Sequence, residues 1–206
     1  MSMIEHARRP VRLLVWGALF VAASVTVGCG SEDPKKAPTE VGGPFGKCNA
    51  MIAKYQVTSA DHVAECSELP DADPPYGGPH YPVWAAFQAY DFPIAHGYLI
   101  HSMEHGAVVF YYNCPEGCSD EVAQAKALIE QEPKDRLCEG TGVERRAVLV
   151  PDPTLDVRWA ASAWGYTLRA ECFDADVFGQ FYTDHYAMAP ENICASGTVF
   201  TSPPCQ

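Results

Sequence analysis

The chain is predicted to fold as an α+β domain, with a small mixed or antiparallel sheet, helices packed on one side and a disulfide-stapled core. Three observations predict this class. Short runs rich in β-branched and aromatic residues are typical of strands. Two longer runs repeat apolar residues at helical spacing. Nine cysteines in 206 residues indicate disulfides, because so many thiols are unusual in a reducing compartment.

The predicted elements of the domain follow one another as strand, helix, two strands and helix. In chain order they occupy residues 106–113, 119–132, 145–153, 157–170 and 174–187. The first helix has acidic residues in its first turn, and we expect Ser119 to cap it. An aspartate is expected to cap the second helix.

The first 28 residues have the pattern of an export signal. Arginines precede an apolar run of about 15 residues, shorter than the roughly 20 that a spanning helix needs. Thr26-Val27-Gly28-Cys29 resembles the processing site of bacterial lipoproteins, with threonine where leucine is usual. We therefore expect cleavage before Cys29 and acylation of its thiol, which would anchor the protein to a membrane. An ordinary signal peptide cut nearby is the alternative.

Residues 29–46 are predicted to form a flexible tether, and residues 47–206 a single domain. The tether segment is rich in glycine, proline and charge, without apolar periodicity. The formal net charge of −12, from 14 basic and 26 acidic side chains, argues against nucleic acid as a partner. The expected location is the bacterial cell envelope, at the periplasmic face or the outer membrane.

Eight cysteines remain after Cys29 and can form up to four disulfides, whose connectivity the sequence leaves open. Proximity suggests Cys48–Cys66, Cys114–Cys118 or Cys114–Cys138, and Cys194–Cys205. The pair Cys114 and Cys118 opens the first predicted helix, where the helix dipole acidifies thiols. A structural disulfide and a working redox or metal-binding pair are both consistent with that position.

Histidines are the strongest candidates for a functional site. His101 and His105 are four residues apart with Glu104 between them, so they share one face of a helix or converge in a tight turn. His80 follows a segment stiffened by prolines and can add a third imidazole. Neutral imidazoles are common transition-metal ligands. Hydrogen-bonded structural histidines, or acid–base chemistry without metal, are the alternatives.

The string HSMEH also fits the HxxEH signature of inverted zinc peptidases, in which the glutamate activates water. Those enzymes carry the motif within a long helix, whereas Gly106 and a strand-like run follow it here. Glu104 is therefore expected either to orient a histidine by hydrogen bonding or, in a zinc-dependent hydrolase, to act as general base.

Three separated segments, in the order PPYGGPHYPVWAAFQAYDFP, GYLIHSMEHGAVVFYYN and FYTDHYAMAPEN, resemble the DUF3105 family of bacterial exported or membrane-anchored proteins. The resemblance runs from about Pro74 to Asn192. The family name assigns no function. The resemblance implies one shared site, because the motif positions include His80, His101, Glu104, His105 and His185.

The leading hypothesis is a metal-binding lipoprotein domain with His80, His101, His105 and His185 as ligands. Copper is the first choice and zinc the second, because imidazoles suit both and a thioether at Met188 would favour Cu(I). Met188 is otherwise an ordinary packing residue. The alternatives are a zinc hydrolase and an envelope interaction or structural domain. His62 and His96 are interpreted as ordinary surface or core residues.

Overall fold

The computed structural model describes residues 37–205, so the predicted signal and Cys29 lie outside the described residues. In chain order its elements are β1 (Glu40–Phe45), β2 (Ala50–Lys54), α1 (His96–Glu104), β3 (Val108–Tyr112), α2 (Ser119–Gln131), a 3₁₀ turn (Arg136–Cys138), β4 (Ala147–Pro151), β5 (Trp159–Ala163), β6 (Tyr166–Ala170) and α3 (Ala175–His185). Within this range no helix combines the length and apolar character needed to cross a bilayer.

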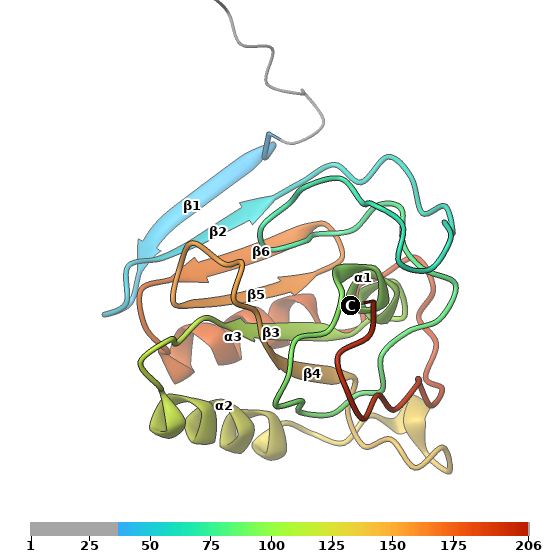
Figure 1. Cartoon of the computed structure of the whole chain (residues 1–206). Helices are drawn as coiled ribbons and strands as arrows, with labels where there is room; N and C mark the ends of the chain where they lie inside the picture. The colour runs from blue at the N-terminus through green and yellow to red at the C-terminus, as the bar shows by residue number, and fades with distance from the viewer. Residues whose placement is uncertain (1–36, 206) are drawn as a thin grey trace, which may run out of the picture. The chain divides into compact units, whose positions relative to one another are not determined.

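The six strands form one mixed sheet in the order β1-β2-β6-β5-β3-β4 (Figure 1). β3 and β4 run parallel and are joined through α2, as parallel neighbours require a crossover. The other neighbouring pairs are antiparallel. The predicted α+β class, with a mixed sheet and disulfides, is confirmed. The expectation of helices on one side holds for α2 and α3 but not for α1, which packs in the other core.

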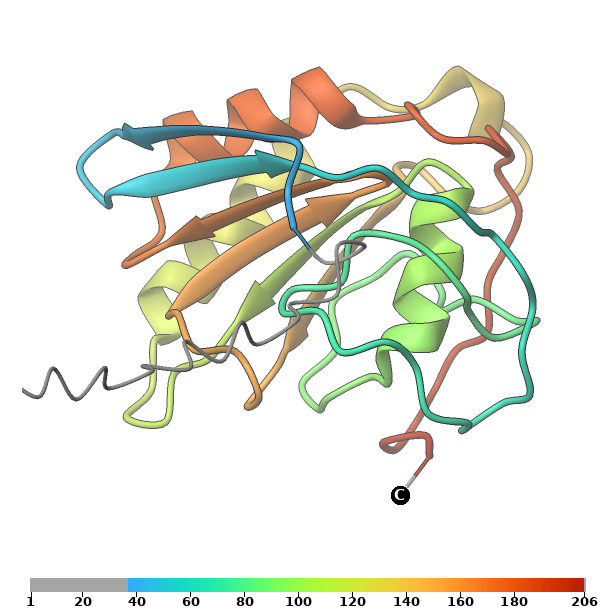
Figure 2. The same cartoon turned by 90° about the horizontal axis from the view of Figure 1, so that it is seen from above.

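Each face of the sheet carries its own apolar core. Along β3, Val108 and Phe110 point to one face while Val109 and Tyr111 point to the other. The two helices predicted from the sequence, α2 and α3, cover the first face, and α1 lies on the second (Figure 2). Residues Gly97–Glu104 of α1 are all buried, so this helix shows no one-sided apolar pattern in the sequence.

Loops from both ends of the domain wrap α1. Gly97 allows the ring of Tyr81 to lie against the helix, since a Cβ there would be 2.5 Å from the ring. Ser102 Oγ donates to Ala85 O at 3.1 Å, and Thr198 N donates to Trp84 O at 2.8 Å. The long loop before α1 and the tail after α3 therefore enclose the helix together.

Three boundaries differ from the sequence predictions. β1 occupies residues assigned to the tether, because its backbone pairs with β2 without needing an apolar pattern. The segment 157–170 forms a hairpin, β5 and β6, turning at Gly165 with a positive φ of 80°. Cys118, not Ser119, is the N-cap of α2, and no side chain caps it. The aspartate cap of α3 is Asp174, as expected.

Four disulfides join the cysteines as Cys48–Cys172, Cys66–Cys205, Cys114–Cys118 and Cys138–Cys194. The Cys114–Cys118 pair was among the suggested ones. The suggestions Cys48–Cys66 and Cys194–Cys205 are wrong, because the true partners are distant in sequence and are brought together by the sheet and its loops.

Replacing Cys114 and Cys118 together with alanine is expected to cost only about 2 kcal/mol, because the closed loop is short and restricts the unfolded chain little. The other three disulfides span 56 to 139 residues and keep the fold. Urea unfolding monitored by tryptophan fluorescence measures the change. A loss of the folded state would show that this pair does more than close a turn.

Candidate metal centre

Four side chains converge on the α1 side of the sheet: His62, His80, His101 and Glu104. One donor atom of each lies within 4.8 Å of the others, and all but His62 are buried. The imidazole centroids of the three histidines are 4.7 to 4.9 Å apart. The sequence interpretation of His62 as an ordinary residue therefore missed a member of the cluster.

The loops carrying His62 and His80 are fixed to one another by backbone hydrogen bonds. His80 N donates to Asp61 O at 3.1 Å, and Val63 N donates to His80 O at 2.8 Å, forming a short parallel bridge. His80 is 0% exposed. His80 lies in the long loop before α1, and the bridge explains how the exposed His62, from an earlier part of the same loop, reaches it.

Hydrogen bonds define the tautomers of the two buried rings. His80 Nδ1 lies 2.8 Å from Gly78 O, and His101 Nδ1 lies 2.7 Å from Tyr81 O. A carbonyl oxygen only accepts, so each Nδ1 must carry the proton. In the neutral rings the Nε2 lone pairs are therefore free, which is the arrangement that second-sphere hydrogen bonds impose on metal-binding histidines.

The free Nε2 of His80 faces a carboxylate. It lies 2.9 Å from Glu104 Oε2, yet the angle is not that of a hydrogen bond, and the nitrogen is buried without a hydrogen-bond partner. Two electron-rich atoms this close repel one another unless a proton or a cation lies between them.

The environment of Glu104 also favours a cation. Burial raises the pKa of its carboxyl, an effect that His80 opposes when it is protonated and that the charge of Glu191 reinforces. Glu104 is the last residue of α1, where the helix dipole disfavours negative charge. Within residues 37–205 no lysine or arginine pairs with it.

His101 is held in its neutral form. Its pKa is lowered to about 4, chiefly by burial; the neighbouring imidazoles of His105, His80 and His62 contribute to this lowering, while the hydrogen bond to Tyr81 O opposes it. An imidazole with this pKa keeps its lone pair available for a metal well below neutral pH.

The metal-free domain is expected to show a His101 ring that stays neutral until the pH falls to about 4. The unfolded chain takes up this proton near pH 6.5, so His101 makes unfolding easier as the pH falls between those values. Glu104, whose pKa is raised, acts with the opposite sign. NMR titration of the His101 ring signals follows His101 separately from Glu104. A His101 midpoint near pH 6.5 would contradict the burial argument.

His105 follows α1 and borders the cluster. Its ring centroid is 4.7 Å from that of His101 and 4.4 Å from that of Trp84. His105 Nε2 is 3.4 Å from Glu191 Oε2, and burial lowers the pKa of the ring. Glu191 is the second participant that the histidine pattern did not reveal, although it lies in the third family-like segment.

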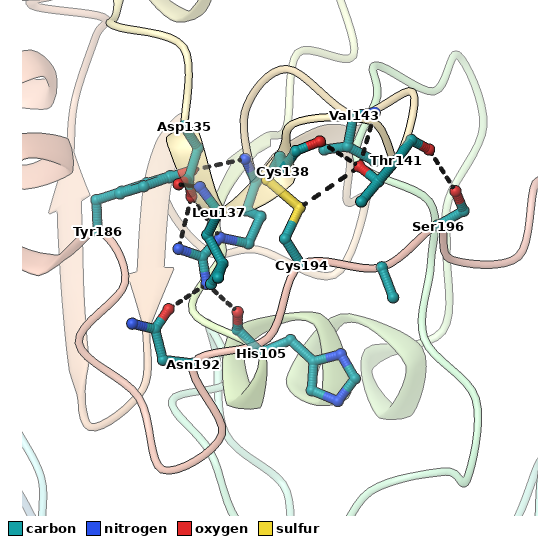
Figure 3. Close-up of a disulfide and its surroundings, with 12 residues drawn as sticks. His105, Asp135, Leu137, Cys138, Thr141, Val143, Tyr186, Asn192, Cys194 and Ser196 are labelled. Atoms are coloured by element: carbon teal, nitrogen blue, oxygen red, sulfur yellow. Dashed lines mark hydrogen bonds and ion pairs between the residues drawn. A yellow bond between two sulfur atoms is a disulfide. The ribbon is translucent and has the colours of Figure 1, made fainter.

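A buried arginine is hydrogen-bonded to the backbone at the C-terminal end of α1. Arg146 Nη1 donates to His105 O at 2.6 Å, and Nη2 pairs with Asp135 at 2.6 Å. Figure 3 shows Asp135, Asn192 and His105 near the disulfide that joins the 3₁₀ turn to the C-terminal tail. The backbone carrying His105 is thus fixed by a charged hydrogen-bond network.

The structure does not bring His185 to this cluster, which corrects the predicted four-histidine set. His185 ends α3 on the opposite face of the sheet, and its ring stacks on Tyr166 with centroids 4.1 Å apart. Met188 follows in the next turn and is 60% exposed, so its thioether is outside the group of converging donors. The spacing of residues along α3 does not reveal on which face of the sheet this helix packs.

Cys114 and Cys118 are bonded to each other, as the disulfide alternative predicted. Their neighbour Glu121 could complete a set of three donors, but its carboxylate already accepts from Arg158 and from Trp159 Nε1. The oxidised pair offers no thiolate for a metal.

A cavity of about 560 Å³ lies beside β4 and α2 and is lined by residues that include Phe87, Lys126, Arg145 and Leu149. None of the four converging residues lines it. The donor cluster and this open cavity are therefore separate features.

Comparison with known proteins places the chain in a family without adding a function. No curated protein and no solved structure matches it. A model of the family described as "Protein of unknown function (DUF3105)" matches residues 62–196, a range that includes every donor of the cluster. The chain belongs to the DUF3105 family.

Proposed function

We propose that this chain is a metal-binding domain in which His62, His80, His101 and Glu104 hold one divalent transition-metal ion. The supporting observation is the 2.9 Å contact between His80 Nε2 and Glu104 Oε2, which lacks hydrogen-bond geometry. Two ligands of a tetrahedral ion with bonds of about 2.0–2.1 Å lie about 3.3 Å apart. The contact is thus near the spacing of two ligands around a shared ion.

Three imidazoles and one carboxylate suit Cu(II) or Zn(II). Cu(I) prefers soft sulfur ligands, and the exposed thioether of Met188 is outside the group. The preference for copper therefore no longer has the support of a methionine, and copper and zinc stand as equal candidates.

Four donors from the protein favour storage, delivery or structural stabilisation, because catalytic zinc keeps a position open for water. A hydrolase in which Glu104 is the general base is the second candidate. It ranks lower, because a general base does not bind the metal itself. Glu104 lies so close to His80 that both side chains can bind the same ion.

We further propose that the domain works outside the cytoplasm, anchored through acylated Cys29. Four disulfides within one chain favour an oxidising compartment. Mass spectrometry of the mature N-terminus tests the anchor: a diacyl or triacyl Cys29 supports it, and an unmodified residue elsewhere at the N-terminus contradicts it.

Elemental analysis of the exported domain, purified without a metal-affinity column, tests the metal site. We expect at least one equivalent of copper or zinc, and no retained metal after reloading and dialysis would refute it. Glu104→Gln distinguishes the two candidates. A ligand role predicts weaker metal binding, whereas a general-base role predicts retained metal and lost turnover.

A further inference from the structure

A second group of donors adjoins the cluster. Glu104, His105 and Glu191 each offer a donor atom within 4.8 Å of the others, and Glu104 belongs to both groups. His105 is 4% exposed and Glu104 is equally buried, while the side chain of Glu191 is 52% exposed. The second group therefore combines two buried donors with one exposed carboxylate.

The protein leaves one polar atom of this group without a partner: His105 Nδ1 is buried and makes no hydrogen bond. His105 Nε2 reaches Glu191 Oε2 only at 3.4 Å. A carboxylate oxygen of Glu104 and one of Glu191 lie within 4.8 Å of each other, and two negative charges at that distance repel. A cation between the two carboxylates and the imidazole would remove this repulsion.

The backbone holds these residues in place independently of any ion. Glu191 N donates to Glu104 O at 3.1 Å, and Ala187 N donates to Gly106 O at 2.9 Å. Arg146 Nη1 donates both to His105 O and to Asn192 Oδ1, each at 2.6 Å. The segment after α3 is therefore attached to the end of α1, next to the labelled His105 and Asn192 of Figure 3.

We propose that a second divalent ion binds to His105, Glu191 and Glu104, with the Glu104 carboxylate bridging the two ions. This inference rests on the proposed function, since it requires the first ion. Carboxylate-bridged ions in two-metal sites lie about 3.5–4 Å apart. Two of the three donors are carboxylates, which suit hard ions such as manganese, and the imidazole also suits zinc, a borderline ion. The exposed edge of this second position leaves room for water ligands and for exchange.

Titration of the metal-free domain with Zn²⁺ alone, in competition with a chromophoric chelator, tests the proposal. The wild-type domain is expected to bind two equivalents, the second more weakly. Glu191→Gln should abolish the second equivalent and retain the first, and its half-exposed position leaves the fold intact. Glu139→Gln removes an exposed carboxylate outside both groups and should keep both equivalents.

Loading with two equivalents of Cu²⁺ gives a separate readout. Two bridged Cu(II) ions couple magnetically, so the EPR signal of isolated Cu(II) should be reduced in the wild type and restored in Glu191→Gln. His105→Gln should behave as Glu191→Gln does. A wild type that binds one equivalent, or a Glu191→Gln variant that keeps two, overturns this inference while the proposed function stands. No bound zinc at all refutes both.

Discussion

Replacing Arg146 with methionine is expected to lower the free energy of unfolding by about 3–5 kcal/mol, because the change leaves a carboxylate without its buried partner. Arg146 is 1% exposed, and its guanidinium donates to Asp135, to His105 O and to Asn192. The guanidinium also lies over the ring of Tyr186, 5.1 Å from its centroid. Methionine fills the space of the aliphatic stem but makes none of these contacts.

Denaturant unfolding measures this effect, with Arg136→Met as the matched control. Arg136 is exposed in the 3₁₀ turn, so its replacement should change the stability by less than about 0.5 kcal/mol. An Arg146→Met variant as stable as the control would show that the network contributes little. Because Arg146 fixes the carbonyl of His105, we also expect the second zinc equivalent to weaken in this variant.

His80→Ala is expected to weaken binding of the first metal ion by about 100- to 1,000-fold. The binding free energy of zinc held by four ligands in small domains is about 10–16 kcal/mol, so losing one ligand is expected to cost about 3–4 kcal/mol of that binding free energy. His80 is the most buried of the proposed ligands and the one in contact with Glu104. Chelator competition with zinc or copper measures the loss.

His185→Gln is the control for this prediction. The sequence grouped His185 with the other histidines, but α3 places it against Tyr166 on the other face of the sheet. The variant should therefore keep the affinity of the wild type. Equal losses in His80→Ala and His185→Gln would contradict the site as the fold assembles it.

Strands β3 to β6 and two of the helices follow from local patterns. β3 is a β-branched and aromatic run ended by Asn113, and α2 repeats apolar residues with acids in its first turn. α1 is hidden from such reasoning, because a helix buried on every side has no polar face. β1 is equally hidden, since it is an edge strand held by backbone pairing alone.

The site was predictable where its residues are close in sequence. His101 and Glu104 are one helical turn apart, and His80 was singled out by its stiffened loop. His62 and Glu191 reach the cluster only through long-range backbone hydrogen bonds, for which no local pattern exists. His185 was misplaced because a family-like motif does not reveal the face of the sheet on which its helix packs.

The most direct test of the metal centre is an anomalous diffraction map of crystals soaked separately in zinc and in copper. We expect a peak within about 2.0–2.2 Å of His80 Nε2, His101 Nε2 and a Glu104 oxygen, with His62 closing the site. No peak at this position, with the His80–Glu104 contact unchanged, would contradict the account and leave the histidines as hydrogen-bonded members of the core.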